Sequence, residues 1–240
     1  MDASTQLSLP VSLRPEPRFG NFVAAEDLYA EVVASLRRCA SASEPSPILL
    51  WGDSGVGLTH LLQSTARLAI ELGRSARYFS LKSLISAETE EAQPQRFLAG
   101  MDAQQVVCLD DVHLCSASAV WEEALFHLFN RLQQRGHALV VSSHEAPANL
   151  SSLLPDLRSR LLSGLVLRVS DLHESGKETL LRRRAKELGI ELGEDVSRFL
   201  LSRLQRDNAS LLGTLDRLDA LSLQQQRRLT LPFVKQALGL

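Results

Sequence analysis

The sequence has 240 residues, of which 45% are hydrophobic and 22% are charged, and its formal net charge at pH 7 is −2. This composition is typical of a globular protein with enough apolar material for one larger domain or two small ones, and it argues against a whole-surface electrostatic grip on DNA. The three cysteines, Cys39, Cys108 and Cys115, form no C-x-x-C pair, which favours a reduced chain with packed thiols.

The N-terminal end predicts an extended tail over residues 1–20, because Pro10, Pro15 and Pro17 disfavour helix. Its first residues lack the basic and apolar regions of a signal peptide. No apolar run in the chain reaches the about 18 residues of a membrane span. We therefore expect a cytoplasmic chain without a membrane partner.

A short motif within this tail, Gln6-Leu7-Ser8-Leu9-Pro10, has the form of an extended docking peptide. Leu7 and Leu9 would fill apolar pockets of a partner, and the Gln6 amide would make the orienting hydrogen bonds. The alternative is a tail whose leucines pack on their own domain. The spacing alone favours that alternative.

A Gly-rich turn between an apolar run and a helix-compatible stretch is the central motif of the chain, and it lies within residues 48–60. Gly52, Gly57 and Thr59 match the phosphate-loop pattern G-x-x-x-x-G-K-[ST], but Leu58 holds the lysine position. The candidate nucleotide-binding residues of this loop are Gly52, Gly55, Gly57 and Thr59. The alternative is a strand–helix turn that binds nothing.

The missing lysine weakens this site in a defined way. Backbone N–H groups and the helix N-terminus still favour an anion. A hydrogen bond to a charged group is worth roughly 1.5–3 kcal/mol, so its loss does not by itself abolish nucleotide binding. Because charge stabilisation dominates phosphoryl-transfer catalysis, we expect negligible ATP hydrolysis by this chain alone.

A second nucleotide signature is the apolar strand 106–111, which ends in Asp110 and Asp111. A carboxylate at the end of such a strand can hold Mg²⁺, which fits Asp110, and Asp111 occupies the position of a carboxylate that polarises water. The alternative is a pair of helix N-cap residues. The phosphate loop about fifty residues upstream favours the nucleotide site.

The remaining patterns of residues 21–170 alternate between helix and strand, which predicts an α/β domain with a parallel sheet and helices on both faces. We expect strands near residues 48–51, 77–81, 106–111, 138–143 and 165–169, and helices over 26–40, 58–72, 83–98 with a break near Pro94, and 121–135. From residue 171 only helical patterns follow, over 174–188, 195–204, 211–223 and 232–238, which predicts a small all-helical domain.

Several polar residues in these elements are candidates for function. Strand 138–143 ends in hydroxyls where such folds sense a γ-phosphate, and His144 after it reads as a solvated loop residue. Arg158 and Arg160 stand in an apolar context, and surface ion pairing is the usual fate of such arginines. The run Arg182–Arg184 favours a solvated helix face over a DNA-binding surface, because glutamates lie nearby.

Taken together, these motifs resemble DnaA and its relatives in the AAA+ family. The similarity is carried by Trp51-Gly52-x-x-Gly55-x-Gly57-x-Thr59-His60-Leu61-Leu62, Cys108-Leu109-Asp110-Asp111, Trp121-Glu122-x-Ala124-x-Phe126-x-Leu128-x-Asn130-Arg131, Leu154-Pro155-Asp156-Leu157-x-Ser159-Arg160-Leu161 and the stretch 226–235. With the tail motif, the whole chain resembles the Hda-type regulatory inactivators of DnaA, which lack the DNA-reading domain of the initiator. The resemblance implies an AAA+ base over 21–170 and a helical lid over 171–240.

The same resemblance implies a function. Hda-type proteins bind the DNA-loaded sliding clamp of DNA polymerase III through the N-terminal motif and promote hydrolysis of the ATP held by DnaA, so that contact with DNA is indirect. By family position, Arg160 would be an arginine finger supplied in trans. Phe126 and Asn130, which share one face of their helix, are candidates for contacting DnaA.

Two departures from the family pattern affect the chain's own nucleotide site. Leu58 replaces the basic residue of the phosphate loop, and Ser210 stands where the lid's sensor arginine is expected. Binding of ADP, with or without Mg²⁺, is therefore weakened, whereas a finger acting on a neighbour's ATP needs neither residue. The alternatives are an autonomous AAA+ ATPase or loader and a degenerate phosphate-loop scaffold that binds only proteins, and the oligomeric state stays open.

The tail motif gives a direct prediction. Replacing Gln6→Ala together with Leu9→Ala should abolish binding to the sliding clamp without unfolding the chain, because one change removes the orienting amide and the other empties an apolar pocket. Retention of wild-type and variant protein on a clamp-bearing column measures this, with circular dichroism as the folding control. Unchanged retention of the variant would contradict the prediction.

Overall fold

The computed structural model describes residues 16–23, 28–41, 46–86, 94–203 and 207–239. The tail residues Gln6, Leu7 and Leu9 lie outside the described residues. The chain divides into two compact units, Pro17–Gly176 with Asp207–Ala209 and Lys177–Arg206 with Ser210–Leu240. None of the described helices is long and apolar enough to cross a membrane.

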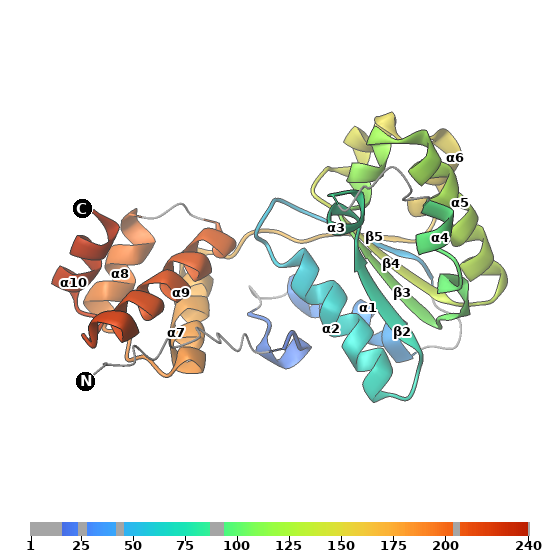
Figure 1. Ribbon diagram of the computed structural model, residues 1–240. Helices are drawn as coiled ribbons and strands as arrows, with labels where there is room; N and C mark the ends of the chain where they lie inside the picture. The colour runs from blue at the N-terminus through green and yellow to red at the C-terminus, as the bar shows by residue number, and fades with distance from the viewer. Residues whose placement is uncertain (1–15, 24–27, 42–45, 87–93, 204–206, 240) are drawn as a thin grey trace, which may run out of the picture. The chain divides into compact units, whose positions relative to one another are not determined.

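The first unit is a parallel sheet with helices on both faces (Figure 1). Its strands are β1 (Ile48–Trp51), β2 (Ala76–Ser80), β3 (Val106–Asp110), β4 (Ala138–Ser143) and β5 (Leu165–Arg168). Its α-helices are α1 (Leu28–Ser41), α2 (Leu58–Glu71), α3 (Leu81–Ser86), α4 (Pro94–Phe97), α5 (Ala119–Gln134) and α6 (Pro155–Leu161). Short 3₁₀ helices are η1 (Phe19–Asn21), η2 (Met101–Ala103), η3 (Val112–Ala117) and η4 (Pro147–Ser152).

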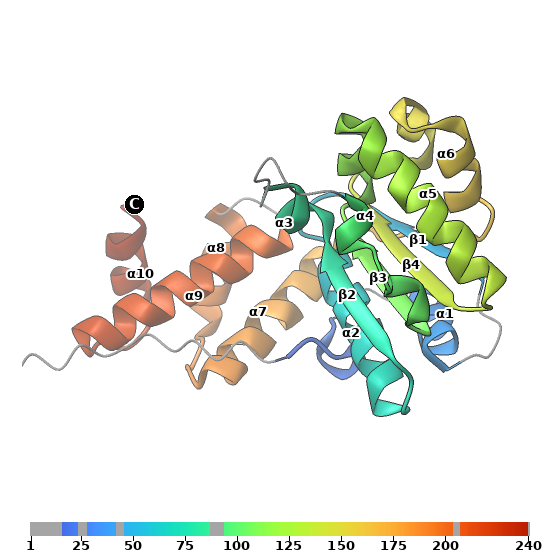
Figure 2. The same ribbon diagram turned by 45° about the vertical axis from the view of Figure 1, so that its right-hand side comes forward.

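The five strands run in the order β2-β3-β4-β1-β5, and every neighbouring pair is parallel. Helices α1 and α2 lie on one face of the sheet, and α4, α5 and α6 lie on the other (Figures 1 and 2). Strands β3 and β4 are buried along their whole length, which explains their nearly unbroken apolar runs. In a parallel sheet the carboxyl ends of all strands share one edge, so the polar residues that end β3 and β4 meet there.

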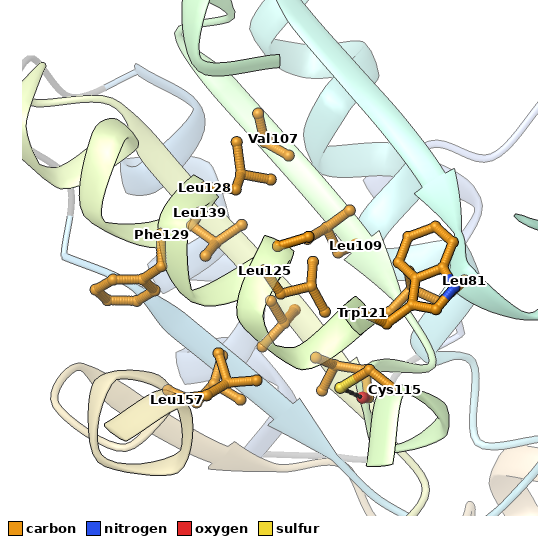
Figure 3. Close-up of a cluster of buried hydrophobic side chains, with 14 of the residues drawn as sticks. Leu81, Val107, Leu109, Cys115, Trp121, Leu125, Leu128, Phe129, Leu139 and Leu157 are labelled. Atoms are coloured by element: carbon orange, nitrogen blue, oxygen red, sulfur yellow. Dashed lines mark hydrogen bonds between the residues drawn. The ribbon is translucent and has the colours of Figure 1, made fainter. Parts of the chain in front are cut away.

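The apolar core beneath α5 fixes this helix on the sheet. Trp121, Leu125, Leu128 and Leu132 follow helical spacing and are all at most 3% exposed. Figure 3 shows Trp121, Leu125 and Leu128 converging with Val107, Leu109 and Leu139 from the strands and with Leu157 from α6, and Leu132 belongs to the same cluster. Helix α5 thus joins the sheet and α6 through one continuous cluster. The helix predicted over 121–135 is confirmed as α5.

The second unit contains only helices among its described residues, as predicted. They are α7 (Glu174–Leu188), whose first turn precedes the unit boundary, α8 (Glu194–Arg203), α9 (Asn208–Gln225) and α10 (Leu231–Leu238). The buried residues Leu181, Leu200, Leu215 and Phe233 belong to one cluster that contains residues from all four helices. This unit therefore has an apolar core of its own.

The arginine run on α7 is divided among ion pairs, which supports the structural interpretation over DNA binding. Arg184 is buried, and its Nε donates to Asp216 Oδ1 of α9 at 2.8 Å. Arg182 pairs with Glu178 at 2.8 Å, and Arg183 lies 3.6 Å from Glu187. Arg184 thus joins α7 to α9, Arg183 pairs along α7, and Arg182 pairs along α7 and also lies 4.0 Å from Glu194 of α8.

Several predicted boundaries differ from the structure. The helix expected over 83–98 is resolved as the short helices α3 and α4, and the residues between them are not described. The strand expected through Asp111 ends at Asp110, because Asp111 has φ of 62° and ψ of 41° and leaves the extended conformation. The Asp111 side chain therefore leaves the backbone in a different direction from that of a strand residue.

The core around α5 gives a stability prediction. Leu128→Ala should destabilise the first unit by about 2–5 kcal/mol, since it leaves a cavity at a side chain that is fully buried. Val120→Ala on the same helix, at a side chain that is 50% exposed, should change stability by about 0.5 kcal/mol or less. Both tryptophans lie in this unit, so urea unfolding followed by tryptophan fluorescence measures it. Equal losses in the two variants would contradict the assignment of the core.

Candidate functional site

The candidate site lies at the carboxyl edge of the sheet, where β1 runs into the loop before α2 and where β3 and β4 end. Gly52, the first loop residue, donates its N–H to the Ser143 carbonyl at 3.2 Å. Thr59 in the first turn of α2 lies within hydrogen-bond distance of Asp110 at the end of β3. The structure therefore brings together the phosphate-loop residues and the carboxylates that the sequence placed in one site.

Two glycines of the loop are fixed by their surroundings. A Cβ atom on Gly52 would lie 2.1 Å from the Val169 carbonyl oxygen, which no side chain can accommodate. Gly57 has φ of 100°, and a Cβ atom there would lie 2.7 Å from the Phe22 ring. Gly57 is also the N-cap of α2, and its carbonyl accepts from Leu61 N at 3.0 Å. The loop thus has the tight backbone of a phosphate-binding turn.

Leu58 begins α2 and is only 2% exposed. The residue at the lysine position is therefore part of the apolar interior. It offers neither a charge nor a hydrogen bond to a phosphate group. The helix N-terminus and the loop N–H groups are left as the attraction for an anion at this point.

Asp110 is a buried carboxylate, with only 2% of its surface exposed. Its Oδ2 accepts from Thr59 Oγ1 at 2.6 Å and from the Tyr78 hydroxyl at 2.8 Å. Its Oδ1 accepts from the Ser142 hydroxyl. Three hydroxyls from α2, β2 and β4 thus stabilise a carboxylate that burial would otherwise penalise strongly. Burial and the charge of Asp110 together raise the pKa of Tyr78 above its usual value.

Asp111 is held differently, by a histidine from the neighbouring strand end. His144 Nε2 lies 3.2 Å from Asp111 Oδ1, and His144 Nδ1 lies 3.2 Å from the Gly52 carbonyl oxygen. The Asp111 N–H donates to the Ser142 hydroxyl at 2.9 Å. Asp111 is the N-cap of η3, yet its side chain makes no capping bond there. The alternative of a simple N-cap pair is therefore not what the structure has.

A second histidine lies beside this pair. The His113 and His144 rings are 5.5 Å apart at a steep angle, and His144 N lies 3.4 Å from His113 Nδ1. Burial lowers the pKa of His113, which favours the neutral ring that this contact with a backbone N–H requires. Burial and the neighbouring Asp110 raise the pKa of Asp111, while His144 acts in the opposite direction.

Sequence reasoning missed Tyr78 and His113 and read His144 as a solvated loop residue. The hydroxyls at the end of strand 138–143 were noted, but Ser142 serves Asp110 and Asp111 here, and Ser143 Oγ caps a turn at Glu145. A useful signal was that Tyr78, Asp110 and Ser142 all lie on neighbouring parallel strands, Asp110 and Ser142 near the ends of theirs. That reasoning needs the strand order, which single-strand patterns do not give.

The residues present fit a nucleotide phosphate with one deficit. The glycine backbone and the N-terminus of α2 suit an anion, and the Thr59 hydroxyl beside the Asp110 carboxylate is the pair of hard oxygen ligands that Mg²⁺ takes next to a phosphate. The deficit is the cation lost at Leu58. Among the described residues no cluster of three or more His, Cys, Asp or Glu side chains could hold a metal ion.

The two arginines of α6 have different environments. Arg158 is half-buried, and its Nη2 donates to the Pro147 carbonyl at 3.4 Å. Arg160 is exposed, and its Nη1 lies 3.5 Å from Gln133 Oε1 of α5. Of the two, Arg160 is the one whose guanidinium faces solvent.

Phe126 and Asn130 lie on α5 and are both partly buried. Phe126 packs against the core cluster beneath α5, and its ring centroid is 5.6 Å from that of His127.

Ser210 lies in the first turn of α9, at the beginning of the longest helix of the second unit. The departure at Ser210 therefore falls at the start of a helix.

Comparison with known families covers nearly the whole chain. Residues 13–168 match the family model of the bacterial DnaA ATPase domain, and residues 174–238 match the family model of the Hda lid domain. The first match covers more than half of the chain.

Solved structures show the same fold. Domain III of the replication initiation protein DnaA from Thermotoga maritima is 23% identical, with a TM-score of 0.82 over 94% of this chain and 97% of that one. AMPPCP-bound DnaA from Aquifex aeolicus is 23% identical, with a TM-score of 0.73 over 88% and 67%. The RuvB branch migration motor of Thermotoga maritima is 16% identical, with a TM-score of 0.71 over 93% and 71%. The expected AAA+ base and helical lid are confirmed.

The raised pKa of Asp111 gives a pH-dependent prediction. A carboxyl group whose pKa is higher in the folded than in the unfolded state loses stabilising contribution as pH rises from the unfolded value through the folded one. Asp111→Asn removes this titration and tolerates the same left-handed backbone. The variant should therefore gain stability relative to wild type between pH 4 and pH 7, measured by urea unfolding at both values. A difference that does not change with pH would contradict the prediction.

Proposed function

Because the chain belongs to the bacterial DnaA ATPase-domain family of AAA+ proteins, we propose that it is a negative regulator of replication initiation that stimulates hydrolysis of ATP bound to DnaA. The match to the Hda lid domain supports a negative regulator, since the Hda-type members of the family are regulatory inactivators. In the proposed reaction the nucleotide and its metal belong to DnaA. This chain supplies one charged group, the guanidinium of Arg160.

The observation that carries the proposal is the contrast between Leu58 and Arg160. The chain's own phosphate loop holds a buried leucine in place of a cation. The end of α6 presents an exposed guanidinium on a well-packed helix whose Leu157 and Leu161 are buried. A protein with a weakened site of its own and an exposed arginine suits catalysis on a neighbour's nucleotide better than catalysis on its own.

The chemistry asked of Arg160 is electrostatic. A planar guanidinium donates to phosphate oxygens in a fixed fork and keeps its charge at every physiological pH. Placed beside the γ-phosphate of a second protein, it stabilises the charge that develops during transfer to water. Fingers of this kind are worth about 10³–10⁵ in rate. Neither Leu58 nor Ser210 takes part in this step.

Recruitment is the second part of the proposal. Gln6, Leu7 and Leu9 bind the sliding clamp loaded on DNA, so the chain reaches DNA only through that partner. Phe126 and Asn130, both partly buried and on one helix, contact the DnaA subunit. These partners imply a cytoplasmic location.

The chain's own site is proposed to bind ADP weakly and to turn over no ATP. Relatives of the family are solved with AMPPCP bound, which supports nucleotide binding at this loop. The lost cation at Leu58 argues against efficient hydrolysis. Purified protein should therefore show no release of phosphate from ATP above a protein-free blank. Turnover that disappears in Asp110→Ala would favour the autonomous ATPase instead.

The finger is tested by the hydrolysis of labelled ATP prebound to DnaA, in the presence of DNA-loaded clamp. Wild-type protein should accelerate conversion to ADP, and Arg160→Ala should reduce this acceleration to the level without added protein. Arg158→Ala is the matched control on the same helix, and it should keep most of the stimulation. Thermal unfolding of each variant verifies that the fold is intact.

The outcomes separate the candidate functions. Full activity of Arg160→Ala would remove the finger assignment, while loss in Arg158→Ala alone would transfer it to the other arginine. A wild-type protein without any stimulation would contradict the regulator and favour a protein-binding scaffold.

A further inference from the structure

We propose that Glu122 and Gln133, at the two ends of α5, are positioning residues that set the orientation of α6 and of the Arg160 guanidinium. This inference rests on the proposed function, because it assigns a catalytic purpose to the way α6 is held. It adds two residues that neither contact a nucleotide nor belong to the phosphate loop.

Glu122 anchors the beginning of α6. Its side chain belongs to a residue that is only 5% exposed, and its Oε1 accepts from the Leu154 N–H at 3.2 Å. Leu154 is the N-cap residue of α6, and its own side chain makes no capping bond. A carboxylate from another helix therefore satisfies a backbone donor at the start of α6 and complements the positive end of that helix. Burying a carboxyl group costs free energy unless it is hydrogen-bonded. The bond to Leu154 therefore also holds the Glu122 side chain in place.

Apolar packing holds the body of α6 against α5. Leu157 and Leu161, four residues apart on α6, are 1% and 3% exposed and belong to the cluster beneath α5. Figure 3 shows Leu157 beside the α5 side chains. Arg158 adds a bond to the Pro147 carbonyl in η4. With one face buried and one end bonded, α6 has little freedom to rotate, and Arg160 is left on the exposed side.

Gln133 restricts the positions that the Arg160 guanidinium can take. Arg160 Nη1 lies 3.5 Å from Gln133 Oε1, at the end of α5. An amide oxygen is a neutral acceptor, so the contact restricts the side chain without cancelling its charge. A phosphate is a stronger acceptor because it is charged, and the guanidinium can exchange the amide for it at little cost. Gln133 thus keeps Arg160 near its working position before the partner arrives.

The proposed partner-contact residues lie between the two anchors. Glu122, Phe126, Asn130 and Gln133 are spaced by four, four and three residues, which places them along one stripe of α5. A DnaA subunit seated on Phe126 and Asn130 would therefore meet Arg160 at a distance fixed by a single helix. Contact and catalysis would share one rigid support, and small displacements of a catalytic group are expensive in rate.

The first test needs only the 240-residue chain, without DnaA or the clamp. Hydrogen exchange followed by mass spectrometry across residues 154–162 should be about tenfold faster in Glu122→Ala, because the start of α6 loses its buried acceptor. Glu122→Gln keeps an acceptor oxygen and should restore most of the protection. The exposed neighbour Glu123→Ala should leave this exchange unchanged. Unchanged exchange in Glu122→Ala would overturn the positioning assignment of Glu122 whatever the function of the chain.

The second test separates positioning from binding. In the DnaA-bound ATP assay, titration of the regulator gives a maximal hydrolysis rate and a half-saturating concentration. Gln133→Ala should lower the maximal rate about 3- to 10-fold with the half-saturating concentration unchanged, since the guanidinium is less often in place. Gln134→Ala, the adjacent residue, is the matched control and should change neither. A shift of the half-saturating concentration alone would make Gln133 a binding residue and contradict the inference.

Failure of this inference differs from failure of the proposed function. If wild-type protein stimulates hydrolysis while Gln133→Ala and Glu122→Ala do so equally well, the function stands and the positioning residues do not. If wild-type protein fails to stimulate hydrolysis, the catalytic purpose given to Glu122 and Gln133 is refuted together with the proposed function. The exchange experiment then still decides whether Glu122 holds α6.

Discussion

The buried carboxylate of Asp110 is the constraint around which the edge of the sheet is built. A charge at this depth must be solvated by the protein, and the solvation comes from three hydroxyls that belong to three different elements, α2, β2 and β4. This arrangement requires the parallel order in which β3 lies between β2 and β4. It also fixes the first turn of α2, and with it the shape of the loop that precedes that helix. Hydrogen bonds within the protein therefore stabilise the geometry of the loop.

The same network bears on how the site tolerates Leu58. In a phosphate loop with lysine, a cation stands near the carboxylate and the bound phosphates. Here the carboxylate is satisfied by neutral donors, and Asp111 has its own partner in His144. The edge of the sheet is consequently well bonded without a ligand. A chain built in this way can keep its base folded and present α5 and α6 to another protein without depending on nucleotide for its architecture.

The sequence predicted best those features that depend on a single helix, strand or turn. The glycines around Leu58, the stripe of α5 and the apolar runs of β3 and β4 follow from local pattern, so the parallel α/β base and the helical domain were predictable. The contacts of Tyr78 and of His144 were not, since each depends on which strands become neighbours. The conformation of Asp111 escaped prediction for a related reason, because its contacts with Ser142 and His144 form only when the ends of β3 and β4 lie side by side. Glu122 looked like an ordinary helix residue until the packing of α6 showed what its carboxylate bonds.

The close contact at Gly52 limits how this loop can change during evolution. A side chain there would collide with the carbonyl of Val169 whether or not any phosphate is bound. Selection for a foldable domain is therefore sufficient to preserve this glycine in lineages whose nucleotide site has decayed. The constraint at the lysine position is of another kind, because Leu58 is buried and its side chain must suit the apolar interior. The presence of Gly52 in a related protein therefore shows that the backbone contact is kept. Whether that protein binds or hydrolyses a nucleotide must be judged from other residues.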